Sequence, residues 1–178
     1  MSFINKIKGI FGKGKGVNSY DVMLLAMGDI CSNLVKHFKN EYYRWNESEN
    51  IKTFECLVLS RFLLDYALLK TFSDKLDKIR MEFYSSIIDH QFKSLLENTF
   101  QDGFTYNTVK DSVDNRLKLY KKALSENPHP RCWQLLAAVL TGTDYYAEED
   151  PVTLVASSSI IPELIMHAQD SLQRVIKP

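Results

Sequence analysis

Apolar side chains dominate the stretch from Phe54 to Phe72, which reads FECLVLSRFLLDYALLKTF. On a helix that turns by about 100° per residue, these side chains fall on every side. A helix that is apolar all round has to be surrounded by other elements. The stretch carries four charged residues, and it is shorter than the roughly 20 mostly apolar residues that a bilayer span needs. We therefore predict that it is the central helix of a soluble all-α domain.

The N-terminal stretch has a different pattern. In residues 3–11, FINKIKGIF, the large apolar side chains fall on one helical arc, two lysines flank that arc, and Asn5 and Gly9 lie opposite. The next residues, GKGKG at positions 12–16, cannot continue a helix cheaply, because each interior glycine costs roughly 1 kcal/mol relative to alanine. We predict a short basic amphipathic helix followed by a flexible linker.

Amphipathic helices are predicted on both sides of the central stretch, because apolar positions recur every three or four residues. One runs from Asn18 or Ser19 to about Trp45, before a polar loop at residues 46–50. The central helix then begins at about Ile51. A short break at residues 72–74 separates it from the next helix, and Ser73 is a candidate cap for that start. The remaining predicted helices run from Asp74 to about residues 101–103, from the Asn107 cap to a stop at residues 127–130, and over the shorter ranges 131–141, 150–161 and 162–177.

No alternating run indicates a strand, and no repeat of 20 to 50 residues is present. The predicted fold is an all-α, single-domain multi-helix bundle of about six helices around the central hydrophobic helix, with a short amphipathic N-terminal helix. Residues 1–16 form the N-terminal helix and its linker, and residues 17–178 form the helical domain.

The charge of the chain is balanced, with 22 basic and 22 acidic residues. No global field therefore attracts nucleic acid, and we predict no nucleic-acid partner. The first 16 residues hold four lysines and no acid, which leaves 18 basic against 22 acidic residues in the rest. Three widely spaced cysteines indicate neither a disulfide framework nor a zinc site. Without a secretory signal pattern, a cytoplasmic location is expected, and attachment through the N-terminus would make the protein peripheral at the inner membrane face.

The N-terminal arc is the most specific candidate for a binding surface. Its aromatic and isoleucine side chains can enter the headgroup region of a membrane while its lysines face anionic lipid. The alternatives are a contact with a protein partner, with the protein's own core or with a second copy of the chain, or a frayed start. The predicted membrane- or partner-binding residues are Phe3, Ile4, Lys6, Ile7, Lys8, Ile10 and Phe11.

The central helix carries the candidate polar site. Arg61 and Asp65 are four residues apart and point the same way, so they can form an ion pair on an otherwise apolar surface. A buried pair of this kind could hold a polar ligand, with Glu55 and His167 as further candidates. The alternative is a purely structural ion pair, because a buried charge needs a partner.

Metal and nucleophile signals are weak. His37 with Glu41 and Glu163 with His167 have helical spacing that could in principle hold a metal, but ordinary solvated or core histidines explain them, and no metal site or cofactor is predicted. Cys132 has no adjacent base or orienting acid. We therefore expect a non-catalytic helical adaptor or regulatory protein, attached through its N-terminus to a membrane surface or partner. The alternative is a helical enzyme or small-ligand-binding protein with a polar site beside the central helix.

Overall fold

The computed structural model describes residues 19–41, 48–100, 105–126, 136 and 160–176. These residues form five helices: α2 (Ser19–Glu41), α3 (Glu49–Phe72), α4 (Lys78–Thr99), α5 (Tyr106–Glu126) and α8 (Ile161–Val175). The predicted all-helical class is confirmed in these ranges, where no strand occurs. The helix predicted at 3–11 lies outside the described residues, and so does the helix predicted at 150–161 except for Ile160 and Ile161. So does all of the segment predicted at 131–141 except Leu136, which is fully buried.

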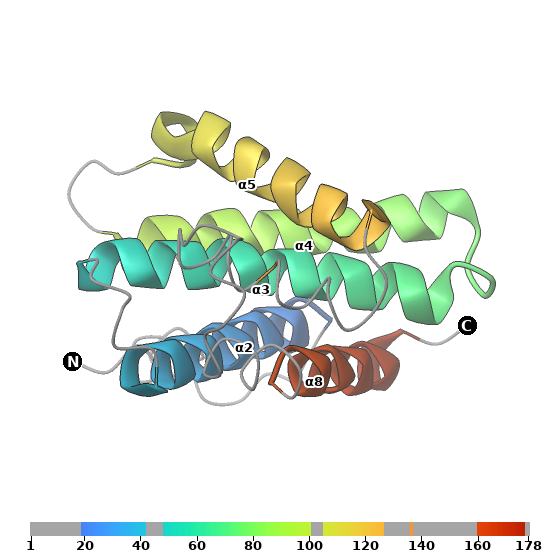
Figure 1. Ribbon diagram of the computed structural model, residues 1–178. Coiled ribbons are helices and arrows are strands. Elements are labelled where there is room, and N and C mark those ends of the chain that lie inside the picture. Colours follow the sequence, from blue (N-terminus) through green and yellow to red (C-terminus); the bar gives the residue numbers. More distant parts are fainter. Residues whose placement is uncertain (1–18, 42–47, 101–104, 127–135, 137–159, 177–178) are drawn as a thin grey trace, which may run out of the picture.

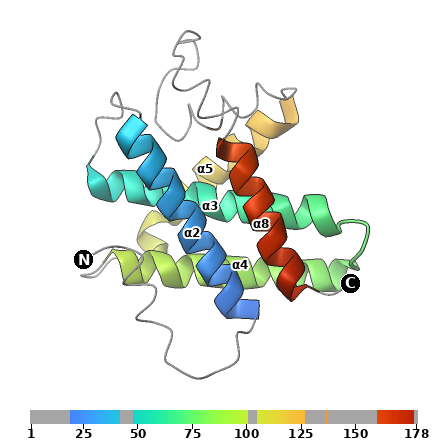
Figure 2. The same cartoon turned by 90° about the horizontal axis from the view of Figure 1, so that it is seen from below.

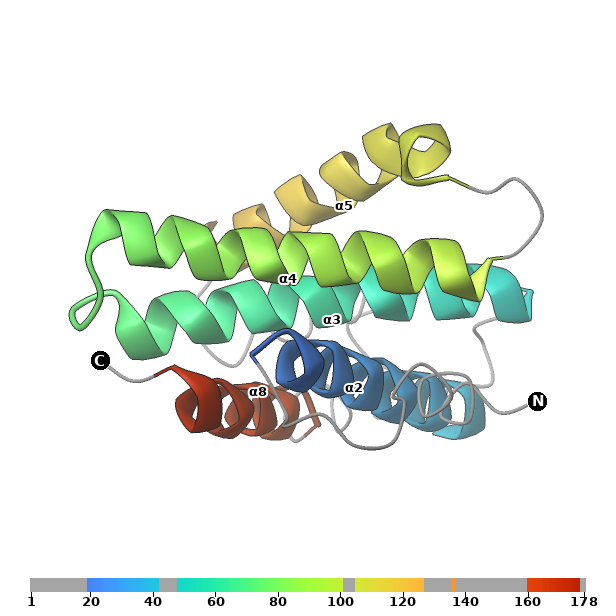
Figure 3. The same ribbon diagram turned by 180° about the vertical axis from the view of Figure 1, so that it is seen from behind.

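The helices are stacked in three layers (Figure 1). The middle layer consists of α3 and α4, which form a hairpin joined by a tight turn. On one side, α2 and α8 lie next to each other and cross both helices of the hairpin obliquely (Figure 2). On the other side, α5 lies over α3 and α4, as the view from behind also shows (Figure 3). Helix α3 contacts each of the other four helices, so the predicted central helix is central in the structure.

The burial of α3 has the all-round character that its sequence indicates. Six consecutive residues, 55–60, are buried, which is possible only when neighbours cover every side of a helix. Leu57, Leu63 and Leu64 are fully enclosed. Two apolar side chains of α3 are nevertheless exposed, Ile51 at 45% and Leu69 at 57%. Within the described ranges, no helix combines the length and apolarity needed to cross a membrane.

The helix ends differ in detail from the sequence prediction. Helix α3 begins two residues before Ile51, because the Ser48 hydroxyl accepts a hydrogen bond of 3.3 Å from the Ile51 amide and caps the first turn. The predicted break after Phe72 is present, but Ser73 does not cap the next helix. It closes α3 by donating its amide to Leu69, and Asp77 caps α4 by accepting 2.8 Å from the Arg80 amide.

The last two helices also begin close to their predicted positions. Helix α5 starts at Tyr106, so Asn107 lies in its first turn instead of capping it. The Tyr106 amide donates to the Glu97 carboxylate of α4 at 3.1 Å, a tertiary partner that the local sequence does not indicate. In α8, Pro162 occupies the first turn, where a missing amide hydrogen is tolerated.

Candidate functional site

The three polar residues predicted on the central helix take part in two separate ion-pair clusters. Glu55 engages Arg116 of α5, whereas Arg61 engages Asp89 of α4. Asp65 lies beside Arg61, with 3.9 Å between its Oδ2 and the Arg61 Nε. The structure thus brings Arg61 and Asp65 together, as their spacing predicts, and gives Glu55 a different partner.

The Glu55–Arg116 pair is bidentate. The Arg116 Nε donates to both carboxylate oxygens at 3.0 Å, and its Nη2 lies 2.9 Å from Oε1. The Glu55 side chain is only 9% exposed and that of Arg116 is 33% exposed. This geometry satisfies the buried carboxylate and ties α5 to α3, which is the arrangement expected of a structural ion pair.

The Tyr120 hydroxyl and the Cys56 thiol are buried groups on which the Glu55 charge acts. The Tyr120 ring packs against Phe62 with 5.3 Å between ring centroids, and its buried hydroxyl has no hydrogen-bond partner among the described residues. Burial, reinforced by the Glu55 charge, raises the pKa of Tyr120 well above its usual value. Burial also raises the pKa of the Cys31 and Cys56 thiols, so both remain protonated and are poor nucleophiles.

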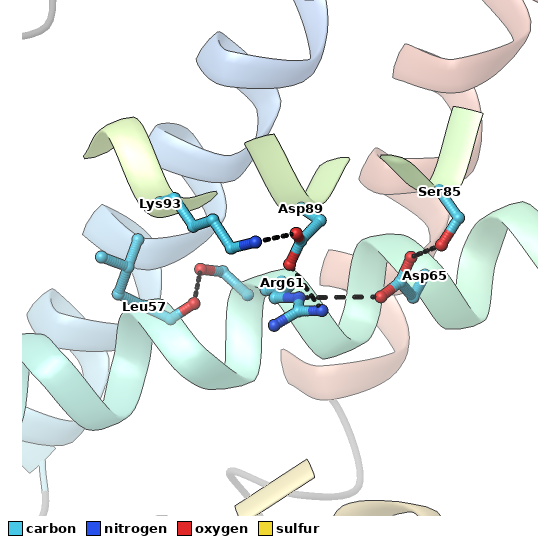
Figure 4. A network of polar contacts seen from close by, with 7 residues as sticks. Leu57, Arg61, Asp65, Ser85, Asp89 and Lys93 are labelled. Atoms are coloured by element: carbon cyan, nitrogen blue, oxygen red, sulfur yellow. Dashed lines mark hydrogen bonds and ion pairs between the residues drawn. The ribbon is translucent and has the colours of Figure 1, made fainter. Parts of the chain in front are cut away.

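The Arg61 guanidinium lies at the centre of the second cluster (Figure 4). Its Nη2 is 2.9 Å from Asp89 Oδ1, and Lys93 holds the other oxygen of Asp89 at 2.5 Å. The Arg61 Cζ stands 5.1 Å from the centroid of the Phe92 ring, within the range of a cation–π contact. Helix α4 therefore supplies a carboxylate, a second cation and an aromatic face to one arginine of α3.

Asp65 is held from two helices. The Ser85 hydroxyl of α4 donates 3.1 Å to its Oδ1, and Arg61 faces its Oδ2 (Figure 4). Burial raises the pKa of Asp65, and the Asp89 charge adds to this effect. The positive charges of Arg61 and Lys121 and the Ser85 hydrogen bond oppose the rise without cancelling it. Desolvation therefore outweighs the attraction of its partners.

Arg61 is incompletely satisfied. A guanidinium has five N–H donors in a planar fork. The Nε and Nη1 atoms are buried and have no hydrogen-bond partner in the described part of the chain, even though the side chain as a whole is 14% exposed. A buried donor without an acceptor costs about 1–3 kcal/mol, and more when it is charged. Of the buried side-chain atoms without a hydrogen-bond partner among the described residues, these two alone belong to a charged group.

A pocket of about 300 Å³ opens beside this arginine, between α3 and α5. Most of its wall is apolar, and Asp65, Lys121 and Ser125 add polar groups. This combination of an apolar wall with a few polar groups is typical of small-molecule sites, and the volume is at the lower end of their range. The lining residues are Arg61, Phe62, Asp65, Tyr66, Leu69, Leu117, Lys121, Leu124 and Ser125.

A second pocket, of about 380 Å³, lies where the α3–α4 turn meets α8. Its wall is polar, and Gln169 of α8 donates 3.0 Å to the Thr71 hydroxyl of α3. None of the unpartnered buried atoms found in the described residues belongs to its wall. His167, a predicted candidate, is exposed on α8 and lines neither pocket. The α3–α5 pocket is therefore the better candidate for a ligand site.

Sequence reasoning missed the partners that give this site its form. Asp89, Phe92 and Lys93 belong to α4, and Leu117 and Lys121 belong to α5. The helical spacing of Asp89 and Lys93 could have indicated an ion pair. Nothing in their local sequence connects them to Arg61, because that connection depends on how α4 packs against α3.

The Asp65 carboxylate provides a pH test of this geometry. Because its pKa is raised in the folded chain, the native state binds a proton more readily than the unfolded state, and its contribution to stability falls as pH rises from about 4 through the raised pKa. Asp65→Asn keeps the acceptor for Ser85 but removes the charge. Relative to the native sequence, we expect Asp65→Asn to be more stable at pH 7 than at pH 3.5. The free energy of unfolding in urea measures this difference.

The exposed Asp111 of α5 supplies the control for this comparison. Asp111→Asn makes the same substitution at an exposed position, and the change seen at Asp65 is judged against it. An Asp65→Asn variant that lost stability on going from pH 3.5 to pH 7, relative to the native sequence, would show that its ionised form is stabilising and that burial is not the dominant effect.

The N-terminal arc, from Phe3 to Phe11, lies outside the described residues. Within the described ranges, no group of three or more His, Cys, Asp or Glu side chains is placed to hold a metal ion. No protein-family model, curated protein or solved structure matches this chain. The arguments on function therefore depend on its own residues.

Proposed function

We propose that the chain is a non-catalytic helical adaptor or regulatory protein that its basic amphipathic N-terminus attaches to an anionic membrane surface or to a protein partner. The observation that carries the proposal is the arc of residues 3–11, with large apolar side chains on one side and lysines at its edges. The glycine-rich residues 12–16 would allow the arc to reach a surface independently of the helical body.

Two features of the chain support this proposal. Each lysine near an anionic surface contributes about 1 kcal/mol, and insertion of the apolar arc adds to this attraction. The attachment would be weak and reversible, as suits a regulatory protein. In the described body, the Glu55 charge is engaged by Arg116 of a neighbouring helix in a manner typical of a scaffold.

Vesicle flotation tests the membrane form of this proposal with two single substitutions in the full-length chain. Ile7→Asp places a charge in the centre of the arc, whereas Asn5→Asp places the same charge opposite it. We expect the native chain and Asn5→Asp to float with vesicles of 30% phosphatidylserine at low salt, and Ile7→Asp to remain in the lower fractions. Binding should also fall at about 1 M salt, where the Debye length is 3 Å.

The other attachments give different results in the same set of proteins. If Ile7→Asp changes the mass measured by light scattering and the native chain does not float, the arc is a contact between copies of the chain. If the native chain neither floats nor differs in mass from Ile7→Asp, the membrane and oligomer forms are both wrong, and a different protein partner remains to be sought by crosslinking from residue 7.

A second proposed function is small-ligand binding, and the pocket between α3 and α5 favours it. A substitution at its exposed rim provides the test, because Ser125→Trp would fill the pocket without disturbing the core. We expect the native chain to enhance the fluorescence of 8-anilinonaphthalene-1-sulfonate and Ser125→Trp to lose most of this enhancement. Equal enhancement in both proteins would place the dye elsewhere and contradict this function.

A further inference from the structure

The chemistry of the α3–α5 pocket specifies its ligand more closely than its shape does. The unpartnered buried atoms beside it, the Arg61 Nε and Nη1, are both donors. Donors require acceptors, so a ligand that completes this site has to bring oxygen atoms with lone pairs. Because the Nε–H and Nη1 lie on opposite edges of the guanidinium, one carboxylate can engage only one of them, and its charge makes that hydrogen bond stronger than one to a neutral carbonyl.

The charges around the pocket also favour an anionic ligand. Among the described residues of this cluster, three are cations, Arg61, Lys93 and Lys121, and two are carboxylates, Asp65 and Asp89. Asp89 is already held by both Arg61 and Lys93, and Asp65 accepts from Ser85. One more negative charge would balance the cluster, and the exposed Lys121 at the pocket wall is placed to share it.

The remaining wall selects the other end of the ligand. Phe62 and Tyr66 of α3 face Leu117 and Leu124 of α5 across the pocket, and Leu69 is exposed beside them. Burying an apolar group against these side chains contributes about 25 cal/mol per Å² removed from water. A small, fully polar anion would leave this surface exposed, whereas an anion with an apolar body would cover it.

We infer that the pocket between α3 and α5 binds a small amphipathic carboxylate, with its head on the Arg61 guanidinium and Lys121 and its apolar body between Phe62, Leu117 and Leu124. This inference rests on the second proposed function and adds the class of ligand. The two Arg61 donors are buried in the unliganded chain, and Arg61 and Lys121 both line the pocket. A carboxylate head that reaches Arg61 would give one of these donors a charge-assisted hydrogen bond.

Three eight-carbon probes with different heads test the inference on the full-length chain by isothermal titration calorimetry: octanoate, 1-octanol and octyltrimethylammonium. We expect octanoate to bind at least about tenfold more tightly than either of the others, since one hydrogen bond to a charged group is worth that much or more. In nuclear magnetic resonance spectra, the Arg61 Nε–Hε signal should move with octanoate and stay in place with 1-octanol.

Substitutions locate the binding without disturbing Arg61, whose removal would break its buried pair with Asp89. Lys121→Glu should weaken octanoate by about tenfold or more. Lys118→Glu makes the same charge change on the same helix but away from the pocket wall, and it should leave the affinity within about twofold. Ser125→Trp should abolish binding.

The possible failures separate the two claims. If 1-octanol binds as tightly as octanoate and Ser125→Trp blocks both, the pocket binds ligands but the carboxylate inference is wrong. If octanoate binds equally to Lys121→Glu and Lys118→Glu, the proposed head position is wrong. If no probe responds to Ser125→Trp, the inference and the small-ligand function are both wrong.

Discussion

Arg116→Ala should lower the free energy of unfolding by about 3 kcal/mol, because it leaves the Glu55 carboxylate buried without its partner. This value is at the lower end of the range for buried pairs, since one third of the Arg116 side chain is exposed and its interaction is partly screened. The fully buried Tyr120 near the carboxylate limits the entry of replacement water. Urea unfolding followed by circular dichroism at pH 7 measures the change.

Replacing both partners separates the stability that the ion pair contributes from the cost of leaving one buried charge without a partner. The double variant Glu55→Leu with Arg116→Met should return to within about 1 kcal/mol of the native chain, because apolar groups of similar size can substitute for a buried ion pair. Lys78→Ala, which breaks the exposed Lys78–Glu82 pair, should cost no more than about 0.5 kcal/mol. If Arg116→Ala cost as little as Lys78→Ala, Glu55 would not be effectively buried.

Leu68→Ala should destabilise the chain by about 3 kcal/mol, because it removes a core side chain that is 1% exposed and leaves a cavity. The adjacent Leu69 is 57% exposed, and Leu69→Ala should change stability by about 0.5 kcal/mol or less. The two substitutions have the same chemistry and occupy neighbouring positions on α3. Their difference in thermal or urea unfolding therefore reports tertiary burial and not helix propensity.

Equal losses at the two positions would contradict the orientation of α3 in the bundle. In that case, either Leu69 would be covered or Leu68 would have room for its surroundings to collapse. A difference of the expected sign, with Leu68→Ala still cooperative in its unfolding, would support the packing of α3 against its neighbours.

The main elements of the fold follow from local patterns. The stretch from Phe54 to Phe72 is apolar in every helical direction. This pattern requires other elements on all sides of the helix, but it does not say which elements they are. Polar capping residues such as Ser48, together with the charged turn after Phe72, limit the helices to within a few residues of their observed ends. The starts of α4 and α5 were less predictable, because several capping residues occur near each start. The local Asp77 side chain caps α4, whereas a contact with Glu97 of α4 holds the first amide of α5.

The candidate site was predictable only in part. The helical spacing of Arg61 and Asp65 predicts that they lie side by side, and they do. Their separation of 3.9 Å is nevertheless longer than the 2.9 Å between Arg61 and Asp89, a partner 28 positions along the chain. The sequence also grouped Glu55 with this pair, although its partner is Arg116 on α5. Residues on the same helix are compared easily in a sequence, whereas residues on different helices are not.

By itself, the sequence determined that the described chain is helical, that α3 is its buried centre, and that Arg61 and Asp65 share one face of that helix. These properties depend on the helical period and on the apolar character of each position, which are local. Only the tertiary structure decided which carboxylate holds Arg61, which of its donors have no acceptor, and that α3 and α5 together line a pocket beside it. Those outcomes depend on the register and crossing of helices that are distant in sequence, and packing of the whole bundle determines them.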